Sequence, residues 1–451
     1  MLIEQFFDAG LGHASYLCAD PEAGVAFLVD PGRDIDMYLG AASRLGVLVT
    51  HSFETHVHND YLSGSRALAD LRPVTVVASR DAGLRYPHQA VTDGDHVRVG
   101  ELDVRAVATP GHTPEHVSWL VADLRRADDP QYLFSGGALL VGHIARVDLL
   151  GPDQEAVLAQ AAFVTLRERV LTLPDHLAVF PTHGGGSSCS GAVAGSRWTT
   201  LGFERKHNHV ARAASSDFGS FRQVIAHELP AVPPYYPHVR ERNREGASPP
   251  ARGPLRQLDE TALARGAAAL LDPRPPHVFA YGHRPGALNV VGNDGFASRV
   301  GATVPFGTAC VILTDDAEQA ERLRGQLAEI GYDLVLGYAT PVPAGTPLEQ
   351  IGSVEPAEAE RLRGAGHLVL DVRELSEWAS GHVPGAVHIP YPQLRARLGE
   401  LPRDRPIITY CASGVRSSLA ASILAADGRA AANLRGGFAA WRRAGLEVAT
   451  G

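Results

Sequence analysis

The sequence is poor in cysteine, in lysine and in long apolar runs, and each shortage excludes a class of protein. The four cysteines, Cys18, Cys189, Cys310 and Cys411, have no paired spacing, so we expect a reducing compartment and at most one reactive thiol. No apolar run reaches the roughly 18 residues that span a bilayer. Lys206 is the only lysine, which we interpret as codon usage and not as function.

The charge and the length narrow the choice further. The net charge of −9 is spread along 451 residues without a basic cluster, which argues against nucleic acid or a membrane surface as a partner. The N-terminal segment has no basic stretch before an apolar one, so we expect no signal peptide and a cytoplasmic location. Apolar residues make up 45% and charged residues 20% of the chain. These values predict a globular protein of two or three domains.

The first half of the chain alternates short apolar segments with turns. Residues 24–30, 46–55, 102–109 and 117–123 are typical of such strands, and helical periodicity appears over 152–173. This mixture predicts an α/β domain whose polar residues lie in loops at strand ends. The proline-rich stretch that follows, residues 229–254, predicts a linker that packs over the protein surface.

The second half of the chain contains a repeat. "LDPR" at 271–274 matches "LDVR" at 370–373, and "GHRPGALNV" at 282–290 matches "GHVPGAVHI" at 381–389. Both pairs are 99 residues apart, and two motifs rarely share one offset by chance. The repeat predicts two copies of a small domain of about 100 residues with a parallel βαβ sheet.

In the second copy an apolar strand runs into a helix through "YCASGVRSS" (410–418), with Cys411 at the end of the strand. Gly414 permits a tight turn, so backbone N–H groups can surround the sulfur at the positive end of the following helix. Both effects favour the thiolate, which is the nucleophilic form. Four residues separate Cys411 from Arg416, one fewer than a cysteine phosphatase needs to enclose a tetrahedral phosphate.

Residues 350–449 resemble the rhodanese family of sulfurtransferases in three motifs, "LDVRELSEWASGHVPGAVHIP", the cysteine loop and "LRGGFAAWRRAGLEV". The resemblance implies that Cys411 accepts a sulfane sulfur from thiosulfate or a low-molecular-weight persulfide and passes it to a thiophilic acceptor. It implies that Arg416 anchors the loop and an anionic substrate, with Ser413 and Gly414 also at the substrate. In the first copy Asp315 takes the place of the cysteine, so this copy is expected to be an inactive spacer or interface.

Histidines gather in loops at the ends of strands in the first half. His56 and His58 stand two residues apart in "ETHVHNDYLSG" (54–64), so both can reach one ion. His112 follows a Pro-Gly turn, and His183 stands in "VFPTHGGGSS" (179–188). Together with Asp60, these residues predict a metal site.

These motifs resemble the metallo-β-lactamase superfamily, and within it the persulfide dioxygenases that are fused to rhodanese domains. The resemblance covers residues 1–245 and implies one Fe(II), held by His56, by His112 and by an aspartate of a later "GD" turn. It also implies oxidation of glutathione persulfide to sulfite. Two histidines and one carboxylate suit an iron that must bind O₂ and substrate together. Arg146 is expected to face an anionic substrate.

The sequence departs from the family pattern at Gly137, which stands where the aspartate ligand is expected. Three alternatives remain open. His56, His58 and His112 can form a three-histidine site of the kind zinc uses. Asp60, His183 or His143 can instead complete a weaker iron site, or the domain binds no metal. Since Tyr61 replaces a ligand of the second site, a two-metal hydrolase is the least favoured.

The sequence thus predicts an α/β multidomain protein: an αββα metallo-β-lactamase sandwich (1–245), a degenerate rhodanese domain (254–346) and a rhodanese domain with an active cysteine (350–449). The predicted cofactor is Fe(II), with zinc as the alternative. The predicted partners are small thiols and persulfides such as those of glutathione, with thiosulfate and sulfite. A zinc-dependent hydrolase and a metal-free binding domain that serves the rhodanese stay open as alternatives. A homo-oligomer is also left open.

Overall fold

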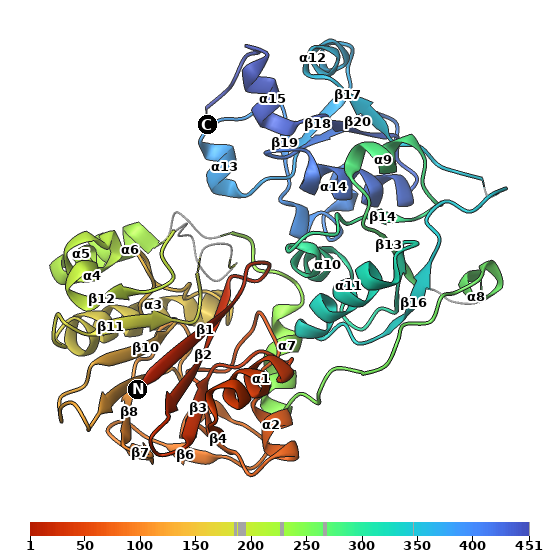
Figure 1. The fold of residues 1–451 in the computed structure, drawn as a ribbon. Coiled ribbons are helices and arrows are strands. Elements are labelled where there is room, and N and C mark those ends of the chain that lie inside the picture. The colour runs from red at the N-terminus through yellow and green to blue at the C-terminus, as the bar shows by residue number, and fades with distance from the viewer. Residues whose placement is uncertain (185–186, 188–194, 226–229, 265–267, 346, 451) are drawn as a thin grey trace. The chain divides into compact units, whose positions relative to one another are not determined.

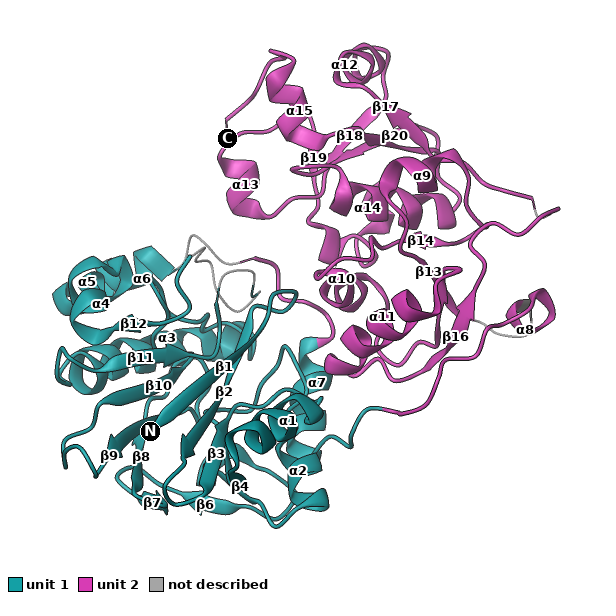
Figure 2. Ribbon diagram, in the orientation of Figure 1, with its two compact units in different colours: residues 1–229, 236–250 teal, residues 230–235, 251–451 magenta. Residues whose placement is uncertain are grey.

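The computed structural model describes residues 1–184, 187, 195–225, 230–264, 268–345 and 347–450, and the chain divides into two compact units (Figure 2). Unit 1 comprises residues 1–229 and 236–250, and unit 2 comprises residues 230–235 and 251–451. The finer boundaries expected at 254–346 and 350–449 stay predictions. None of the described helices has the length and apolar character needed to cross a membrane.

Unit 1 contains two six-stranded sheets, ordered β1-β2-β3-β4-β5-β6 and β12-β11-β10-β9-β8-β7. The first sheet consists of β1 Leu2–Asp8, β2 His13–Asp20, β3 Val25–Val29, β4 Leu48–Phe53, β5 Thr75–Ser79 and β6 Gln89–Val91. The second sheet consists of β7 His96–Val99, β8 Leu102–Ala108, β9 Val117–Asp123, β10 Tyr132–Gly136, β11 Ala178–Pro181 and β12 Thr199–Thr200. In the first sheet β3, β4, β5 and β6 run parallel, which aligns the ends of these strands at one edge.

The two sheets pack face to face around an aromatic core. Phe53 of the first sheet and Trp119 of the second meet edge to face with ring centroids 4.9 Å apart, a favourable arrangement for two aromatic rings. Strand β9 shows how the sequence produces this layering. Its alternate residues Val117, Trp119 and Val121 enter the core between the sheets, while Leu120 packs against the helices on the other face.

Helices cover both outer faces of the sandwich, as Figure 1 shows. The first sheet is covered by α1 Asp36–Leu45 and α2 Ser65–Leu71. The second sheet is covered by α3 Pro152–Val164, a π-helical turn Thr165–Val170, α4 Leu201–His207, α5 His209–Ser216 and α6 Phe218–Ile225. A short 3₁₀ turn, Arg80–Ala82, follows β5, and α7 Tyr236–Glu245 ends the unit. The predicted αββα architecture is confirmed.

Unit 2 contains two parallel sheets, ordered β14-β13-β15-β16 and β17-β21-β20-β18-β19. The first copy consists of α8 Glu260–Ala264, β13 Ala269–Asp272, α9 Pro276–Tyr281, β14 Leu288–Asn289, α10 Phe296–Thr303, β15 Cys310–Leu313, α11 Ala317–Glu329 and β16 Val335–Ala339. The second copy consists of β17 Gly352–Val354, α12 Pro356–Gly364, β18 Leu368–Asp371, α13 Leu375–Ala379, β19 Val387–His388, the 3₁₀ turns Tyr391–Gln393 and Leu398–Glu400, β20 Ile407–Tyr410, α14 Val415–Ala426, β21 Ala431–Leu434 and α15 Gly437–Arg443.

The two copies repeat each other strand by strand. Leu271 pairs with Leu288 in the first copy, and Leu370 pairs with Val387 in the second, at the 99-residue offset seen in the sequence. The paired aspartate and arginine recur too, with closest contacts of 2.6 Å in Asp272–Arg274 and 2.5 Å in Asp371–Arg373. Asp371 and Arg373 therefore hold the scaffold.

Two expectations need correction. Cys411 follows directly after β20, Ile407–Tyr410, and the corresponding strand Cys310–Leu313 is followed directly by Thr314. Thr314, and not Asp315, therefore occupies the cysteine's place in the first copy. The expected linker at 229–254 also contains a regular helix, α7. Pro237 stands at its second position, in the first turn where a proline removes no helical hydrogen bond, and the other prolines lie outside the helix.

Candidate active sites

The Cys411 loop is built as the sequence predicts. All four residues of β20 are buried, which fixes the point from which Cys411 leaves the sheet. Gly414 has φ +100°, a left-handed conformation that glycine adopts without steric cost, and this turn starts helix α14. Ser413 lies exposed in the loop, and Gly414 is buried.

Polar groups surround the sulfur of Cys411. The Gly414 N–H donates to Sγ at 3.1 Å, and the Ser417 hydroxyl lies 3.4 Å from Sγ. The 12-residue helix α14 begins beside the sulfur, so its positive end adds to the stabilisation of a negative charge there. The cysteine is 1% exposed. The loop can therefore stabilise a thiolate or a persulfide sulfur.

The start of helix α15, near the C-terminus, packs against the Cys411 loop. The Phe438 N–H donates to the Cys411 carbonyl at 2.7 Å, and the Ala439 N–H donates to the Ala412 carbonyl at 3.1 Å. A side chain at Gly437 would collide with the Cys411 carbonyl oxygen. The glycines of "LRGGF" therefore allow the two segments to approach closely.

Arg416 forms a bidentate ion pair with Glu377 of α13, with N–O contacts of 2.6 and 2.8 Å. Burial opposes the charged form of Glu377, but Arg416 outweighs that effect, so the pKa of the Glu377 carboxyl is lowered. The charge of Arg416 is thus balanced by a partner that sequence reasoning missed, and the expected role of Arg416 in anchoring the loop and the substrate stays a prediction. Glu377 lies 39 residues away, and no local pattern connects the two.

Three histidines converge in unit 1 at the ends of strands. His56, His112 and His183 each offer a ligand atom, and these atoms lie within 4.8 Å of one another. Nε2 of His56 lies 3.3 Å from Nε2 of His183. All three side chains are buried. Burial, together with the neighbouring histidines, holds the pKa of His56 and of His112 well below the usual value, so their neutral rings can act as ligands.

Outer contacts orient two of these rings. The Arg146 carbonyl lies 2.7 Å from His112 Nδ1 and accepts a hydrogen bond from the Nδ1–H group, which leaves the lone pair of Nε2 for a ligand role. On the other side of the cluster, Asp60 Oδ2 lies 3.2 Å from His183 Nδ1. A carboxylate behind a ligating histidine fixes its orientation and raises its basicity.

The third ring is oriented through a hydroxyl. Thr55 Oγ1 donates to Asp30 Oδ2 at 2.7 Å and lies 2.8 Å from His56 Nδ1. Because its hydrogen goes to the carboxylate, the hydroxyl accepts from His56 Nδ1–H. Nε2 of His56 then carries the lone pair that faces His183.

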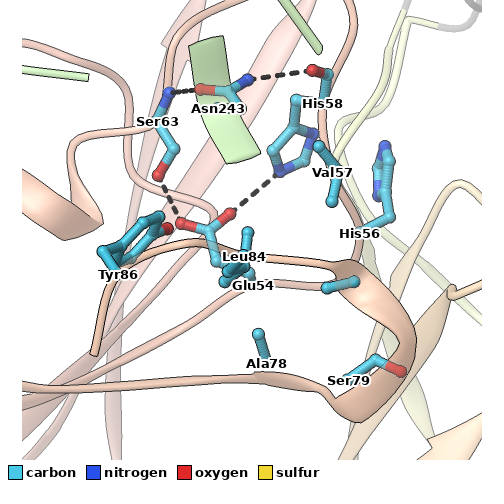
Figure 3. Close-up of a pocket in the computed structure, with 11 residues that line it drawn as sticks. Glu54, His56, Val57, His58, Ser63, Ala78, Ser79, Leu84, Tyr86 and Asn243 are labelled. Carbon is cyan, nitrogen blue, oxygen red and sulfur yellow. Dashed lines mark hydrogen bonds and ion pairs between the residues drawn. The ribbon is translucent and has the colours of Figure 1, made fainter. Parts of the chain in front are cut away.

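His58 faces a different set of partners from the one expected. Its Nε2 lies 3.2 Å from Asp30 Oδ1 and 3.3 Å from Glu54 Oε2, and Figure 3 shows His58 turned toward Glu54. Burial opposes a charge on His58, but the two carboxylates prevail and raise its pKa to about 10. His58 also belongs to a second group of potential ligands with Asp60 and His183. The structure thus brings His183 to His56 and His112, and pairs His58 with carboxylates.

The place of the missing carboxylate is closed. A Cβ at Gly137 would lie 2.7 Å from His112 Cδ2 and 2.9 Å from Ala145 Cβ. The Gly137 N–H donates to His116 Nε2 at 2.9 Å. Sequence reasoning missed His116, whose ring stacks on that of His56 with centroids 5.0 Å apart; the only available signal was its place in "PGHTPEH".

The three-histidine group fits a metal ion. Two nitrogens bound to one tetrahedral ion at about 2.0–2.1 Å lie about 3.3 Å apart, which is the separation of the His56 and His183 Nε2 atoms. If both Nε2 atoms carried a lone pair, the two lone pairs would repel each other at this distance. A proton or a metal cation between the two nitrogens removes this repulsion. A hollow of ≈ 10 Å³, with room for about one water molecule, is lined in part by His56 and His58; Figure 3 shows its lining.

Helix α7 supports the histidine loop from behind. The Asn243 side chain donates to the carbonyls of His58 and Tyr61 at 2.9 and 2.8 Å, and accepts from the Ser63 N–H at 2.9 Å. Arg240 donates to the Val57 carbonyl at 2.9 Å. The stretch expected to be a linker therefore positions the candidate metal ligands.

Comparisons with known proteins identify the family of the chain. Residues 355–444 match the family model of the rhodanese-like domain. The chain is 30% identical over 189 residues to the persulfide dioxygenase ETHE1 of Homo sapiens, covering 41% of this chain and 68% of that protein. The chain belongs to the persulfide dioxygenase family. Membership of this family, with the rhodanese domain, indicates an enzyme of sulfur metabolism.

Two further similar proteins match parts of the chain. A sulfurtransferase of Allochromatium vinosum is 40% identical over 82 residues, which is 18% of this chain and 77% of that one. A solved structure of a metallo-β-lactamase from Staphylococcus aureus superposes with a TM-score of 0.68 at 28% identity, covering 76% of this chain and 99% of that one. The predicted family and fold class are both confirmed.

Arg146 is buried and forms a bidentate ion pair with Asp148, with contacts of 2.6 and 2.7 Å. Its carbonyl orients His112. A role of Arg146 at the substrate stays a prediction. Cys18 and Cys310 are buried, with their thiol pKa values raised by burial, so Cys411 is the reactive candidate among the described cysteines; Cys189 lies outside the described residues.

Proposed function

We propose that the protein is a sulfurtransferase that carries sulfane sulfur as a persulfide on Cys411. The observation that carries this proposal is the environment of Sγ, which receives the Gly414 N–H and lies at the start of α14. The Cys411 thiolate attacks the sulfane sulfur of the donor and forms a new S–S bond. The bond between that sulfur and the donor breaks, and its electron pair leaves with the donor. The acceptor then removes the sulfur from Cys411.

Thiosulfate and cyanide test this step. The wild-type protein is expected to form thiocyanate, and Cys411→Ser is expected to lose at least about 99% of this activity, because an alcohol is not a comparable nucleophile. Cys310→Ser is the matched control, since Cys310 lies in a buried strand away from any such loop. Thiocyanate formation that survives in Cys411→Ser would refute the proposal.

We further propose that His56, His112 and His183 hold one divalent metal ion and that unit 1 oxidises a low-molecular-weight persulfide to sulfite. A bound iron would supply the site that brings O₂ and the persulfide together. The chain's own residues do the rest of the positioning. His56 and His183 present Nε2 atoms 3.3 Å apart, Asp60 orients His183, and the buried surroundings exclude bulk water.

The missing carboxylate at Gly137 favours a second candidate function for unit 1. Three histidines are the ligand set with which zinc activates water, so a zinc-dependent hydrolase is the alternative. Metal analysis of the purified protein and O₂ uptake on glutathione persulfide separate the candidates. Stoichiometric iron with uptake supports the dioxygenase, zinc without uptake supports the hydrolase, and the absence of metal supports a binding domain that serves the rhodanese.

The identity of the ligands is tested independently of activity. His183→Ala is expected to lower bound metal from about one ion per chain to less than about a tenth, because one of three ligands is lost. His58→Gln, the control on the neighbouring position, keeps a polar group facing Asp30 and Glu54 and is expected to retain the metal. Retention in His183→Ala together with loss in His58→Gln would assign the site to His58 instead.

A further inference from the structure

The two rhodanese copies of unit 2 pack against each other along the helix that follows the active cysteine. Ser418 of α14 donates to Asn289 Oδ1 at 2.6 Å, and the Asn289 N–H donates to Ser422 Oγ at 3.1 Å. Ala421 of α14 lies in one apolar cluster with Phe279 and Val311 of the first copy. The inactive copy therefore fixes the position of the catalytic helix.

This packing brings a basic residue of the inactive copy to the active site. Helix α10 packs against the 3₁₀ turn Tyr391–Gln393 of the second copy. From this helix, the Arg299 guanidinium interacts electrostatically with Tyr391, Cys411 and Arg416. The electrostatic surroundings of Cys411 thus include a cation that lies more than a hundred residues earlier in the chain.

The charges of the two arginines are balanced differently. Arg416 is neutralised by its ion pair with Glu377. Among the described residues Arg299 has no carboxylate partner; its Nη2 donates to the neutral oxygens of Val291, at 2.7 Å, and of Asn293. Its Nε is buried without a hydrogen-bond partner in the described part of the chain. Such a buried donor beside an uncompensated charge is costly unless an anion binds to it.

We propose that Arg299 of the inactive copy binds the oxyanion group of the sulfur donor at Cys411. The inference rests on the proposed sulfurtransferase function and names its substrate class, a small sulfur oxyanion such as thiosulfate. It also gives the degenerate copy a function beyond that of a spacer. Arg299 is a specificity-determining residue here, and Cys411 remains the nucleophile.

The reaction explains why a cation is useful at this position. The Cys411 thiolate attacks the outer sulfur of thiosulfate, and a bond forms between Sγ and that sulfur. The bond between the two thiosulfate sulfurs breaks, and its electron pair leaves with sulfite. Cys411 becomes a persulfide anion, and the total charge is unchanged. Arg299 offsets the repulsion between the thiolate and the dianion on approach, and stabilises the charge on the departing sulfite.

Arg299→Gln tests the proposal when two donors are compared. The donors are thiosulfate and the persulfide of 2-mercaptoethanol, which carries no oxyanion group. We expect the KM for thiosulfate to rise about tenfold, which corresponds to about 1.4 kcal/mol, and kcat/KM to fall at least five times more for thiosulfate than for the persulfide. Arg322→Gln, on an exposed position of α11, is the control and should leave both donors unchanged.

Asn293→Asp neutralises the charge of Arg299 without removing the arginine. This near-isosteric change places a carboxylate against Arg299 Nη2, so the KM for thiosulfate should again rise severalfold, with a smaller effect on the persulfide. It keeps the test valid if Arg299→Gln does not fold, because the packing of Arg299 is retained. The dependence of the thiosulfate KM on salt should weaken in both variants.

Two results would overturn the inference: an unchanged KM for thiosulfate in both variants, or an equal loss for both donors. Neither result touches the sulfurtransferase proposal, which depends on Cys411. If Cys411→Ser remained active instead, the function itself would be wrong, whatever Arg299 does. The two failures are therefore distinguishable.

Discussion

Gly137 shows how one residue changes the chemistry open to a site. The family pattern places an aspartate there, and the structure has neither the carboxylate nor the space for it, because a Cβ would lie 2.7 Å from His112. His183 lies where it can serve as the third metal ligand instead, with its Nε2 atom 3.3 Å from Nε2 of His56. In the metal site that we propose, the donor set is therefore three histidines instead of two histidines and a carboxylate.

Restoring the aspartate tests this interpretation. We expect Gly137→Asp to displace the His112 ring, to destabilise the protein by about 1–3 kcal/mol as overpacking does, and to lower bound metal. Gly137→Ala adds the same Cβ without a carboxylate and should do the same. Thermal unfolding and metal content measure both effects. Higher metal content in Gly137→Asp than in the wild type would show that the site still accepts the family's ligand set.

Among single residues, the sequence predicted those that stand in a recognisable local motif. Cys411, His56 and His112 stand in short motifs with recognisable spacing. Glu377 and Arg299 could not be predicted, because each reaches its site from a distant segment. The direction in which His58 turns depends on the buried carboxylates Asp30 and Glu54, and sequence spacing alone gives no such direction.

Among the elements, helix α7 has a larger role than its composition indicates. Prolines within and on both sides of residues 236–245 predicted a linker. In the structure Asn243 and Arg240 of this helix donate hydrogen bonds to the backbone of the histidine segment. The strand that leads to Cys411 was predictable, since its four residues are all buried and such strands are largely apolar. The packing of α7 depends on polar contacts that have no periodic pattern.

Asn243→Ala should loosen the histidine segment. Three hydrogen bonds to the backbone of residues 58–63 are lost, and buried backbone groups left unpaired cost about 1–3 kcal/mol each. Amide hydrogen exchange over residues 56–63 should become faster, and bound metal should fall. Glu245→Ala on the same helix removes only a 3.4 Å contact between exposed side chains, so it should change neither quantity. Unaltered exchange in Asn243→Ala would mean that α7 does not position the segment.

At the scale of the whole molecule, the domain order was predictable because each domain carries its own signature. The 99-residue repeat reappears as matching strand pairs, and the alternation of strands and helices in the first half becomes a sandwich of two sheets. The relation between the two copies was not predictable. It depends on polar contacts such as Ser418 with Asn289, which join positions that the repeat itself does not relate.

The central claim is that sulfur is carried on Cys411, and the mass of the protein after exposure to thiosulfate tests it most directly. We expect one added sulfur atom per chain, located on the peptide that contains Cys411, removed by cyanide and absent from Cys411→Ser. We also expect no sulfur on Cys18 or Cys310, which are buried in strands. A protein that gains no sulfur, or gains it on another cysteine, would contradict the account.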